Sequence, residues 1–179
     1  MNIFQRIQNI LVSPASEWQA IAGEPNNAVL LMTAFAFPLI AIGSVATFLG
    51  WSLRGAVLGG LELAIVGFVL GVAFTIAVGV VASKIAPQFG GREDMGAALK
   101  LAVYAQVPGW LGGIFNLLPS IAMVGMIFAL YDIYLIYTGA TPMLGVTGDK
   151  RMPFTAILTG AIIVILLFMV VISGIIVRA

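Results

Sequence analysis

The chain has 179 residues and a net charge of +1, and 61% of its residues are hydrophobic while only 8% are charged. Such a weak net charge creates no strong electrostatic field, so we expect no nucleic-acid partner. The sequence contains no cysteine and no histidine, which excludes disulfides, thiolate metal sites and imidazole chemistry, and it predicts neither a metal nor a cofactor.

The apolar residues are gathered into runs long enough to cross a hydrocarbon core of about 30 Å. The sequence therefore predicts an all-α polytopic membrane protein in a lipid bilayer, with five transmembrane helices preceded by short amphipathic interfacial helices. We expect two parts: an N-terminal amphipathic interfacial segment over residues 1–27 and a five-helix transmembrane domain over residues 28–179.

Residues 2–12 place apolar side chains at helical spacing with polar ones opposite, which is typical of a helix lying in the membrane interface. Ser13 and Pro14 then form an N-cap followed by proline at the first helical position, and they predict a second short helix that carries Trp18 and Ile21. Two interpretations remain open: both helices rest on the membrane surface, or they dock a partner.

Five longer segments are predicted to span the membrane. They cover residues 28–49, 56–83, 96–118, 120–137 and 153–177. Pro38 and Pro108 lie within the first and third spans, where each proline removes a backbone donor, so we expect kinks at both positions. The fourth span is predicted to stop at Gly139 and Pro142.

A stripe of small residues follows one side of the second predicted span. It contains Gly60, Ala64, Gly67, Gly71, Thr75 and Gly79 at spacings of three and four. Such a stripe lets another helix backbone approach closely, so it predicts a tight contact within the bundle or between protomers of a homo-oligomer. Glu62 lies roughly 140 to 200° around the helix from the stripe. It should face a different helix, a cavity, an oligomer partner or the headgroups.

Asp132 is an acidic residue inside the fourth predicted span. An aspartate near the centre of a span costs roughly 2.5 to 3.5 kcal/mol on translocon scales, so such residues usually face protein, water or a partner. Tyr104 is predicted at nearly the same depth on the adjoining helix, and we expect it to hydrogen-bond Asp132. Glu62 is predicted at a different depth, which disfavours a paired-carboxylate enzyme but is compatible with acids at two levels of a hydrated path. The alternative is that Asp132 is a structural packing element.

The basic residues are shared unevenly between the two sides that five spans define. The N-terminal side carries Arg6, Lys84, Arg92, Lys100, Lys150 and Arg151, whereas the other side carries Arg54 and Arg178. The positive-inside rule therefore predicts a cytoplasmic N-terminus. Lys100, near the start of the third span, is expected to snorkel to the interface.

Several short motifs occur in a distinctive order along the chain. They are Ser13, Pro14, Trp18 and Ile21, then Tyr104 and Pro108, then the hairpin at Pro119, and finally Tyr131, Ile133, Tyr134, Leu135, Tyr137 and Gly139. In this order the chain resembles the Ypt-interacting-protein (Yip) domain family, in a prokaryotic form. The resemblance implies an integral protein of the bacterial cytoplasmic (inner) membrane. Eukaryotic members of the family sit in secretory-pathway membranes, bind small prenylated GTPases and help to organise vesicle traffic.

No catalytic constellation is recognisable, because no serine is accompanied by a plausible base and the usual hydrolytic motifs are missing; we expect no enzyme and no catalytic residue. The first function hypothesis is a membrane scaffold or adaptor that organises the bilayer or binds membrane-protein partners. The alternative is a small transporter or channel in which Asp132 and Glu62 lie along a polar path between helices broken at Pro38 and Pro108.

Overall fold

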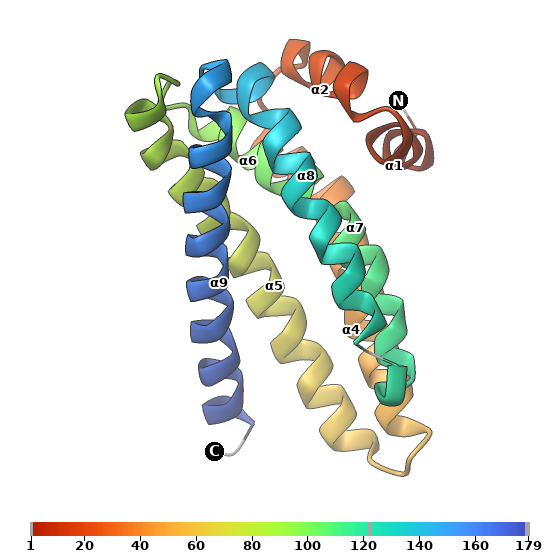
Figure 1. Cartoon of the computed structure of the whole chain (residues 1–179). Coiled ribbons are helices and arrows are strands. Elements are labelled where there is room, and N and C mark those ends of the chain that lie inside the picture. Colours follow the sequence, from red (N-terminus) through yellow and green to blue (C-terminus); the bar gives the residue numbers. More distant parts are fainter. Residues whose placement is uncertain (1, 122, 178–179) are drawn as a thin grey trace.

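The computed structural model describes residues 2–121 and 123–177, and every regular element in these residues is a helix (Figure 1). In chain order the elements are α1 (Ile3–Val12), α2 (Pro14–Gly23), α3 (Ala28–Leu30), η1 (Leu31–Ala36), α4 (Phe37–Ser52), α5 (Val57–Ile85), η2 (Ala86–Phe89), α6 (Met95–Ala105), α7 (Val107–Gly112), η3 (Gly113–Leu117), η4 (Pro119–Ile121), α8 (Val124–Leu144), η5 (Gly148–Lys150) and α9 (Arg151–Ile176). The all-α prediction is confirmed for these residues.

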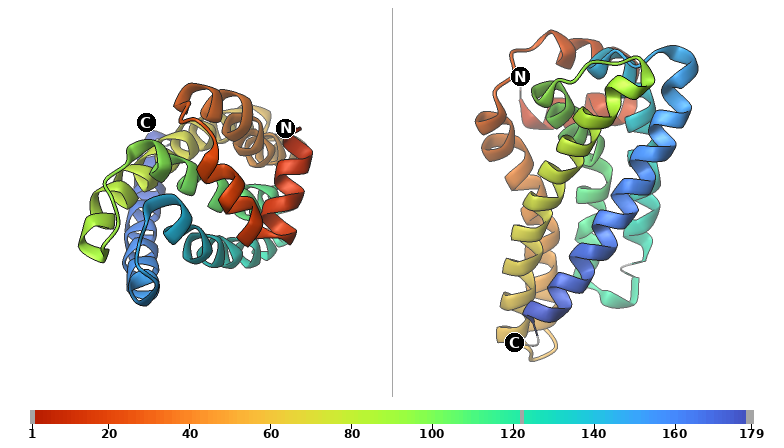
Figure 2. Two further views of the ribbon diagram at one scale, coloured as in Figure 1. Left: turned by 90° about the horizontal axis from the view of Figure 1, so that it is seen from above. Right: turned by 90° about the vertical axis from the view of Figure 1, so that its left-hand side faces the viewer.

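In the described part of the chain, four helical segments are long and apolar enough to cross a membrane. They are Ala28–Ser52, Val57–Phe89, Ile127–Leu144 and Gly148–Ile176. These segments run along a common direction as a bundle, and α1 and α2 lie across one of its ends (Figure 1, Figure 2). We call α1 and α2 together the cap, and the end of the bundle where they lie the capped end. The chain is thus an integral membrane protein whose first two helices close one end of a membrane bundle.

The stretch predicted as the third span is divided into shorter pieces. Helix α6 ends at Ala105, α7 begins at Val107, and the chain continues as the 3-10 helix η3. Pro108 accounts for the first break, because proline lacks a backbone donor and its ring clashes with the preceding turn. The third predicted span is therefore interrupted close to Pro108, where a kink is expected. Within residues 2–121 and 123–177, four continuous helical segments meet the length and hydropathy that a span requires, so a fifth span is not confirmed.

The first span changes its helix type just before Pro38. Leu31–Ala36 forms a π-helix, and an α-helix continues from Phe37 to Ser52. Short π segments are inserted in α-helices where the hydrogen-bond ladder is disturbed. The disturbed part of this span is therefore the turn before the predicted kink.

The fourth span continues beyond its predicted end. Helix α8 runs through Gly139 and Pro142 to Leu144, and Gly145 follows it with a left-handed φ of 71°. The backbone N–H of Gly145 donates to Thr141 O at 2.8 Å, and that of Val146 donates to Ala140 O at 3.4 Å. The prediction that Gly139 and Pro142 stop the helix is wrong, because a left-handed glycine is needed for this termination and Pro142 lies too close to the end to break more than the last turn.

The most deeply buried side chains gather toward the capped end. They include Ile10, Trp18, Ile21, Leu101, Leu135, Met143, Leu144 and Phe154. The far part of α9 instead exposes Ile163, Val164, Leu167, Phe168, Val171 and Ile175. Exposed apolar side chains on a long apolar helix are what a lipid-facing surface requires. The polypeptide core therefore lies beneath the cap, and the opposite half of the bundle is covered chiefly by lipid.

Glycines allow α7 and η3 to approach the neighbouring helices closely. A Cβ on Gly113 would lie 2.8 Å from Gly43 Cα, and a Cβ on Gly112 would lie 2.9 Å from Gly125 O. No real side chain fits at these distances. The closest backbone approaches of this region therefore join α7 and η3 to α4 and α8.

The small-residue stripe on α5 makes close contacts at some of its positions only. A Cβ on Gly60 would lie 2.8 Å from Trp51 Cβ, and a Cβ on Gly71 would lie 3.0 Å from Ile40 Cγ2. Ala64 is buried. At Gly67, however, no described atom lies within 4 Å of an added Cβ. Gly67 instead lines a cavity between α4, α5 and α7, so the close packing predicted for the stripe does not extend to this position.

Candidate functional site

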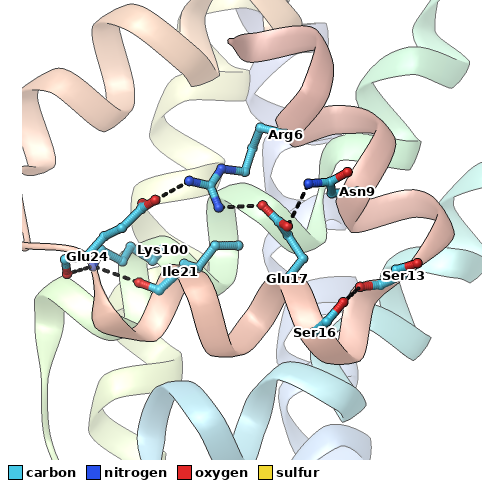
Figure 3. Close-up of polar contacts among 8 residues, drawn as sticks. All are labelled: Arg6, Asn9, Ser13, Ser16, Glu17, Ile21, Glu24 and Lys100. Carbon is cyan, nitrogen blue, oxygen red and sulfur yellow. Dashed lines mark hydrogen bonds and ion pairs between the residues drawn. The ribbon is translucent and has the colours of Figure 1, made fainter. Parts of the chain in front are cut away.

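Buried ion pairs hold the two helices of the cap together. The guanidinium of Arg6 donates to Glu17 Oε1 at 2.5 Å and also pairs with Glu24 (Figure 3). Asn9 Nδ2 donates to the second oxygen of Glu17 at 3.0 Å. Arg6 and Glu17 are only 5% and 6% exposed, so both charges depend on these partners for the hydrogen bonds that water would otherwise supply.

Lys100 of α6 fastens the cap to the bundle. Its Nζ donates to the backbone oxygens of Ile21, at 3.2 Å, and of Glu24 (Figure 3). These carbonyls belong to the C-terminal end of α2, where a cation is favoured by the helix dipole. The side chain of Lys100 is only 4% exposed, so its ammonium group is bound by α2 at the capped end.

Trp18 is the main apolar anchor between the cap and α8. Its side chain is fully buried, and its Nε1–H donates to Thr138 Oγ1 at 3.1 Å. A Cβ on Gly139 would lie 2.7 Å from Trp18 Cε2, so only glycine leaves room for the indole at this point of α8. Tyr131 adds a second bond, because its hydroxyl donates to Leu11 O at 2.9 Å.

Tyr104 of α6 lies at the same junction. Its ring packs edge-on against Trp18 with a centroid distance of 6.4 Å, and it packs against Phe35 at 4.8 Å. The guanidinium carbon of Arg6 lies 5.6 Å from the centre of the Tyr104 ring, which is within the range of a cation–π interaction. Tyr104 is thus a contact residue of the cap.

Asp132 has a different partner from the one that the sequence predicts. Its Oδ1 accepts a hydrogen bond from the backbone N–H of Gly109 at 3.1 Å, and its partners among the described residues do not include Tyr104. Gly109 lies in the first turn of α7, where backbone N–H groups have no partner within the helix. Asp132 therefore caps, from α8, the helix that begins after the break near Pro108.

We expect Asp132→Asn to change the free energy of unfolding little, because an asparagine oxygen still accepts from Gly109. Asp132→Leu should cost about 1 to 3 kcal/mol, since it leaves that N–H unsatisfied. Gly109→Ala should also destabilise, because its methyl group would lie 2.7 Å from Asp132 Oδ2. Reversible denaturation of the detergent-solubilised variants measures these differences. Equal losses for Asp132→Asn and Asp132→Leu would contradict the capping role.

Glu62 lies apart from this region. It is exposed on the outer surface of α5. Among the residues that the structure describes, four cavities can be compared with the hypothesis of a polar path, and Glu62 and Asp132 line none of these four. The structure therefore brings neither Asp132 and Tyr104 nor Asp132 and Glu62 together as one polar site.

The largest of these cavities, of about 490 Å³, lies beside the cap. It is bordered by Arg6, Glu24, Lys100 and Tyr104 together with apolar residues of α3 and η1. A smaller cavity of about 220 Å³ lies deeper, between α4, α5 and α7, and is lined in part by Ser44, Thr47 and Asn116. The polar groups of the junction are thus accessible from a cavity, whereas Asp132 is engaged in a backbone contact.

The motifs noted in the sequence come together at this junction. Trp18 of the first motif contacts Tyr104 of the second and Gly139 of the last. The fold and the junction define a helical, polytopic membrane protein whose N-terminal cap is built into the bundle. A model of the Yip1 domain matches residues 9–172, so the chain belongs to the Yip1 domain family. Proteins of this family are generally non-enzymatic membrane proteins. No curated protein and no solved structure matches the chain.

Proposed function

We propose that this Yip1 domain protein is a membrane scaffold or adaptor of the prokaryotic type, which binds membrane-protein partners through its cap. The observation that carries the proposal is the buried Arg6–Glu17 pair, which together with Lys100 fixes the cap rigidly to the bundle. A surface that is held rigidly loses little conformational entropy when a partner binds to it.

The outer surface of the cap is available to such a partner. Its exposed residues include Phe4, Gln5, Gln8 and Val12 on α1 and Ala15, Ser16, Gln19 and Ala20 on α2. This surface combines uncharged polar side chains with two large apolar ones, Phe4 and Val12, which are 76% and 74% exposed. The mixture suits a partner at the membrane boundary, because it offers both hydrogen bonds and apolar contact.

The geometry gives less support to a small transporter or channel. That alternative needs Asp132 and Glu62 along one path, but Asp132 is engaged by Gly109 and Glu62 is exposed on α5. The adaptor proposal instead depends on the junction between the cap and the bundle, where the motif residues Trp18, Tyr104 and Gly139 meet.

Site-specific photo-crosslinking in native membranes tests the adaptor. A benzophenone amino acid at Gln5, Gln8 or Gln19 should give a discrete adduct with one membrane protein, and Arg6→Leu should abolish it by loosening the cap. The same probe at Val164 or Leu167, on the lipid-facing part of α9, serves as the control and should give lipid adducts. Two results together would contradict the adaptor proposal and favour transport. The probes on the cap would give only lipid adducts, and the protein in liposomes would show a solute flux that Asp132→Asn abolishes.

We further propose that the chain crosses the bacterial cytoplasmic membrane five times, with the capped end in the cytoplasm. The pieces α6, α7 and η3 follow one another along the bundle beside α8 and serve together as the remaining crossing (Figure 1). Six of the eight Lys and Arg residues of the sequence lie at the capped end, either in α1, in α6 or near the ends of the helices that meet there. This distribution agrees with the positive-inside rule for a capped end in the cytoplasm.

Cysteine labelling tests this topology in a chain that has no native cysteine. Gln88→Cys and Gly148→Cys should react with an impermeant maleimide only after the membrane is opened, whereas Leu53→Cys and Ser120→Cys should react in intact cells. Gly148 is suitable because nothing lies within 4 Å of an added Cβ, whereas a Cβ on Gly91 would lie 2.8 Å from Leu144 O. Labelling of Gln88→Cys from outside would overturn the orientation.

A further inference from the structure

The cavity beside the cap combines two chemically different walls. One wall carries Arg6, Glu24 and Lys100, and the other carries Leu30, Ala34 and Phe35 from the beginning of the first span. Leu30 and Ala34 are exposed, whereas Phe35 is buried. The cavity of about 490 Å³ therefore reaches inward from the side of the first span, at the level where that span begins and where lipid headgroups lie.

The charged wall holds unused hydrogen-bond donors. Among the hydrogen bonds of the described residues, Lys100 uses two of its three N–H donors and Arg6 uses two of its five. Both cations are buried and lie within reach of the cavity. A phosphate group is the chemical partner that such donors recognise, because it accepts several charge-assisted hydrogen bonds at once.

The same wall also carries an accessible negative charge. Glu24 pairs with Arg6, but its side chain remains 42% exposed, against 7% for Arg6. A ligand with only negative charge would be repelled by this carboxylate, whereas a ligand that also carries an ammonium group would be attracted to it. The balance of charges thus favours a zwitterion over an anion.

We propose that this cavity binds one zwitterionic phospholipid that carries a primary ammonium group. Its phosphate accepts hydrogen bonds from Lys100 and Arg6, its ammonium donates to Glu24, and its acyl chains leave the cavity along Leu30 and Ala34. This proposal does not rest on the adaptor function, since a lipid bound here would fill the space between the cap and the first span whatever the cap binds.

Native mass spectrometry of the delipidated full chain, titrated with single lipids, tests the proposal. Phosphatidylethanolamine should bind with a stoichiometry of one and at least about tenfold more tightly than phosphatidylglycerol or phosphatidylcholine. Ala34→Trp should lower this affinity at least about tenfold by filling the cavity, whereas the matched control Ala156→Trp, at an exposed position of α9, should not. Glu24→Gln keeps an acceptor for Arg6 but should remove the preference over phosphatidylcholine.

Three results would overturn the proposal. The first is equal binding of all three lipids, and the second is equal affinity in Ala34→Trp and Ala156→Trp. The third concerns the source of the headgroup: soluble glycerophosphoethanolamine should compete only weakly because it lacks acyl chains. If it displaces the lipid at comparable concentration, the site recognises a soluble phosphate compound and not a membrane lipid. Thermal unfolding of each variant without lipid shows whether the cap is still folded.

Discussion

Arg6→Leu is expected to lower the free energy of unfolding by about 3 to 5 kcal/mol, because it leaves the carboxylate of Glu17 buried without a counter-charge. Glu17 is 6% exposed and accepts from Arg6 and Asn9. The remaining bond from the Asn9 amide is neutral and cannot balance a full negative charge. Reversible denaturation in detergent measures the loss, and hydrogen exchange should show that α1 is the first helix to open.

Two variants separate the lost ion pair from other effects of leucine. Gln5→Leu makes a similar substitution one position earlier, at an exposed residue, and should change stability by less than about 0.5 kcal/mol. The double variant Arg6→Leu/Glu17→Leu removes both charges and should recover much of the loss, because apolar replacement of a whole buried pair is often neutral. A double variant that is as unstable as the sum of its two single variants would show that the pair is not energetically coupled.

The cap illustrates how far the sequence could predict this fold. The helical pattern of residues 2–12 and the helix start predicted at Ser13 and Pro14 agree with the observed beginnings of both short helices to within a residue or two, although the Ser13 side chain makes no capping hydrogen bond. The pattern places Arg6 among the polar side chains opposite the apolar ones, and this placement is wrong, because Arg6 is buried at helical spacing between Ile3 and Ile10. The sequence indicates neither this burial nor the partner eleven residues further along.

The third crossing shows a different limit of sequence reasoning. Hydropathy depends on composition, so residues 96–118 resemble the other spans even though their backbone is broken between Ala105 and Val107. The similar predicted depths of Asp132 and Tyr104 favour a hydrogen bond between these two side chains, but the partner of Asp132 is the N–H of Gly109, which the break makes available. A pattern of side chains does not show which backbone N–H groups an irregular turn leaves without a partner. The sequence therefore suffices to predict a membrane protein of this family, but it does not predict which groups form hydrogen bonds between the helices.

Trp18→Ala is expected to destabilise the chain by about 3 to 5 kcal/mol, the usual cost of removing a fully buried aromatic side chain. The indole fills the space above Gly139 and meets the edge of the Tyr104 ring, so its loss leaves a cavity between the cap, α6 and α8. Trp18→Phe should cost less, since it retains most of the apolar contact but gives up the hydrogen bond to Thr138, worth about 1 kcal/mol.

A complementary substitution on α8 tests the same contact from the other side. Gly139→Leu places a side chain where even a Cβ would lie 2.7 Å from the indole of Trp18, so it should displace the cap. The combination Gly139→Leu/Trp18→Ala should be more stable than the sum of the single losses, because the leucine can occupy space that the indole vacates once the flexible end of Leu101, whose Cδ1 would lie 2.6 Å from the new Cβ, has shifted. Trp51→Ala, at a tryptophan that is 41% exposed, is the matched control and should cost less than half as much as Trp18→Ala. Similar losses for Trp18→Ala and Trp51→Ala, measured by denaturation in detergent, would mean that the cap is not anchored through Trp18.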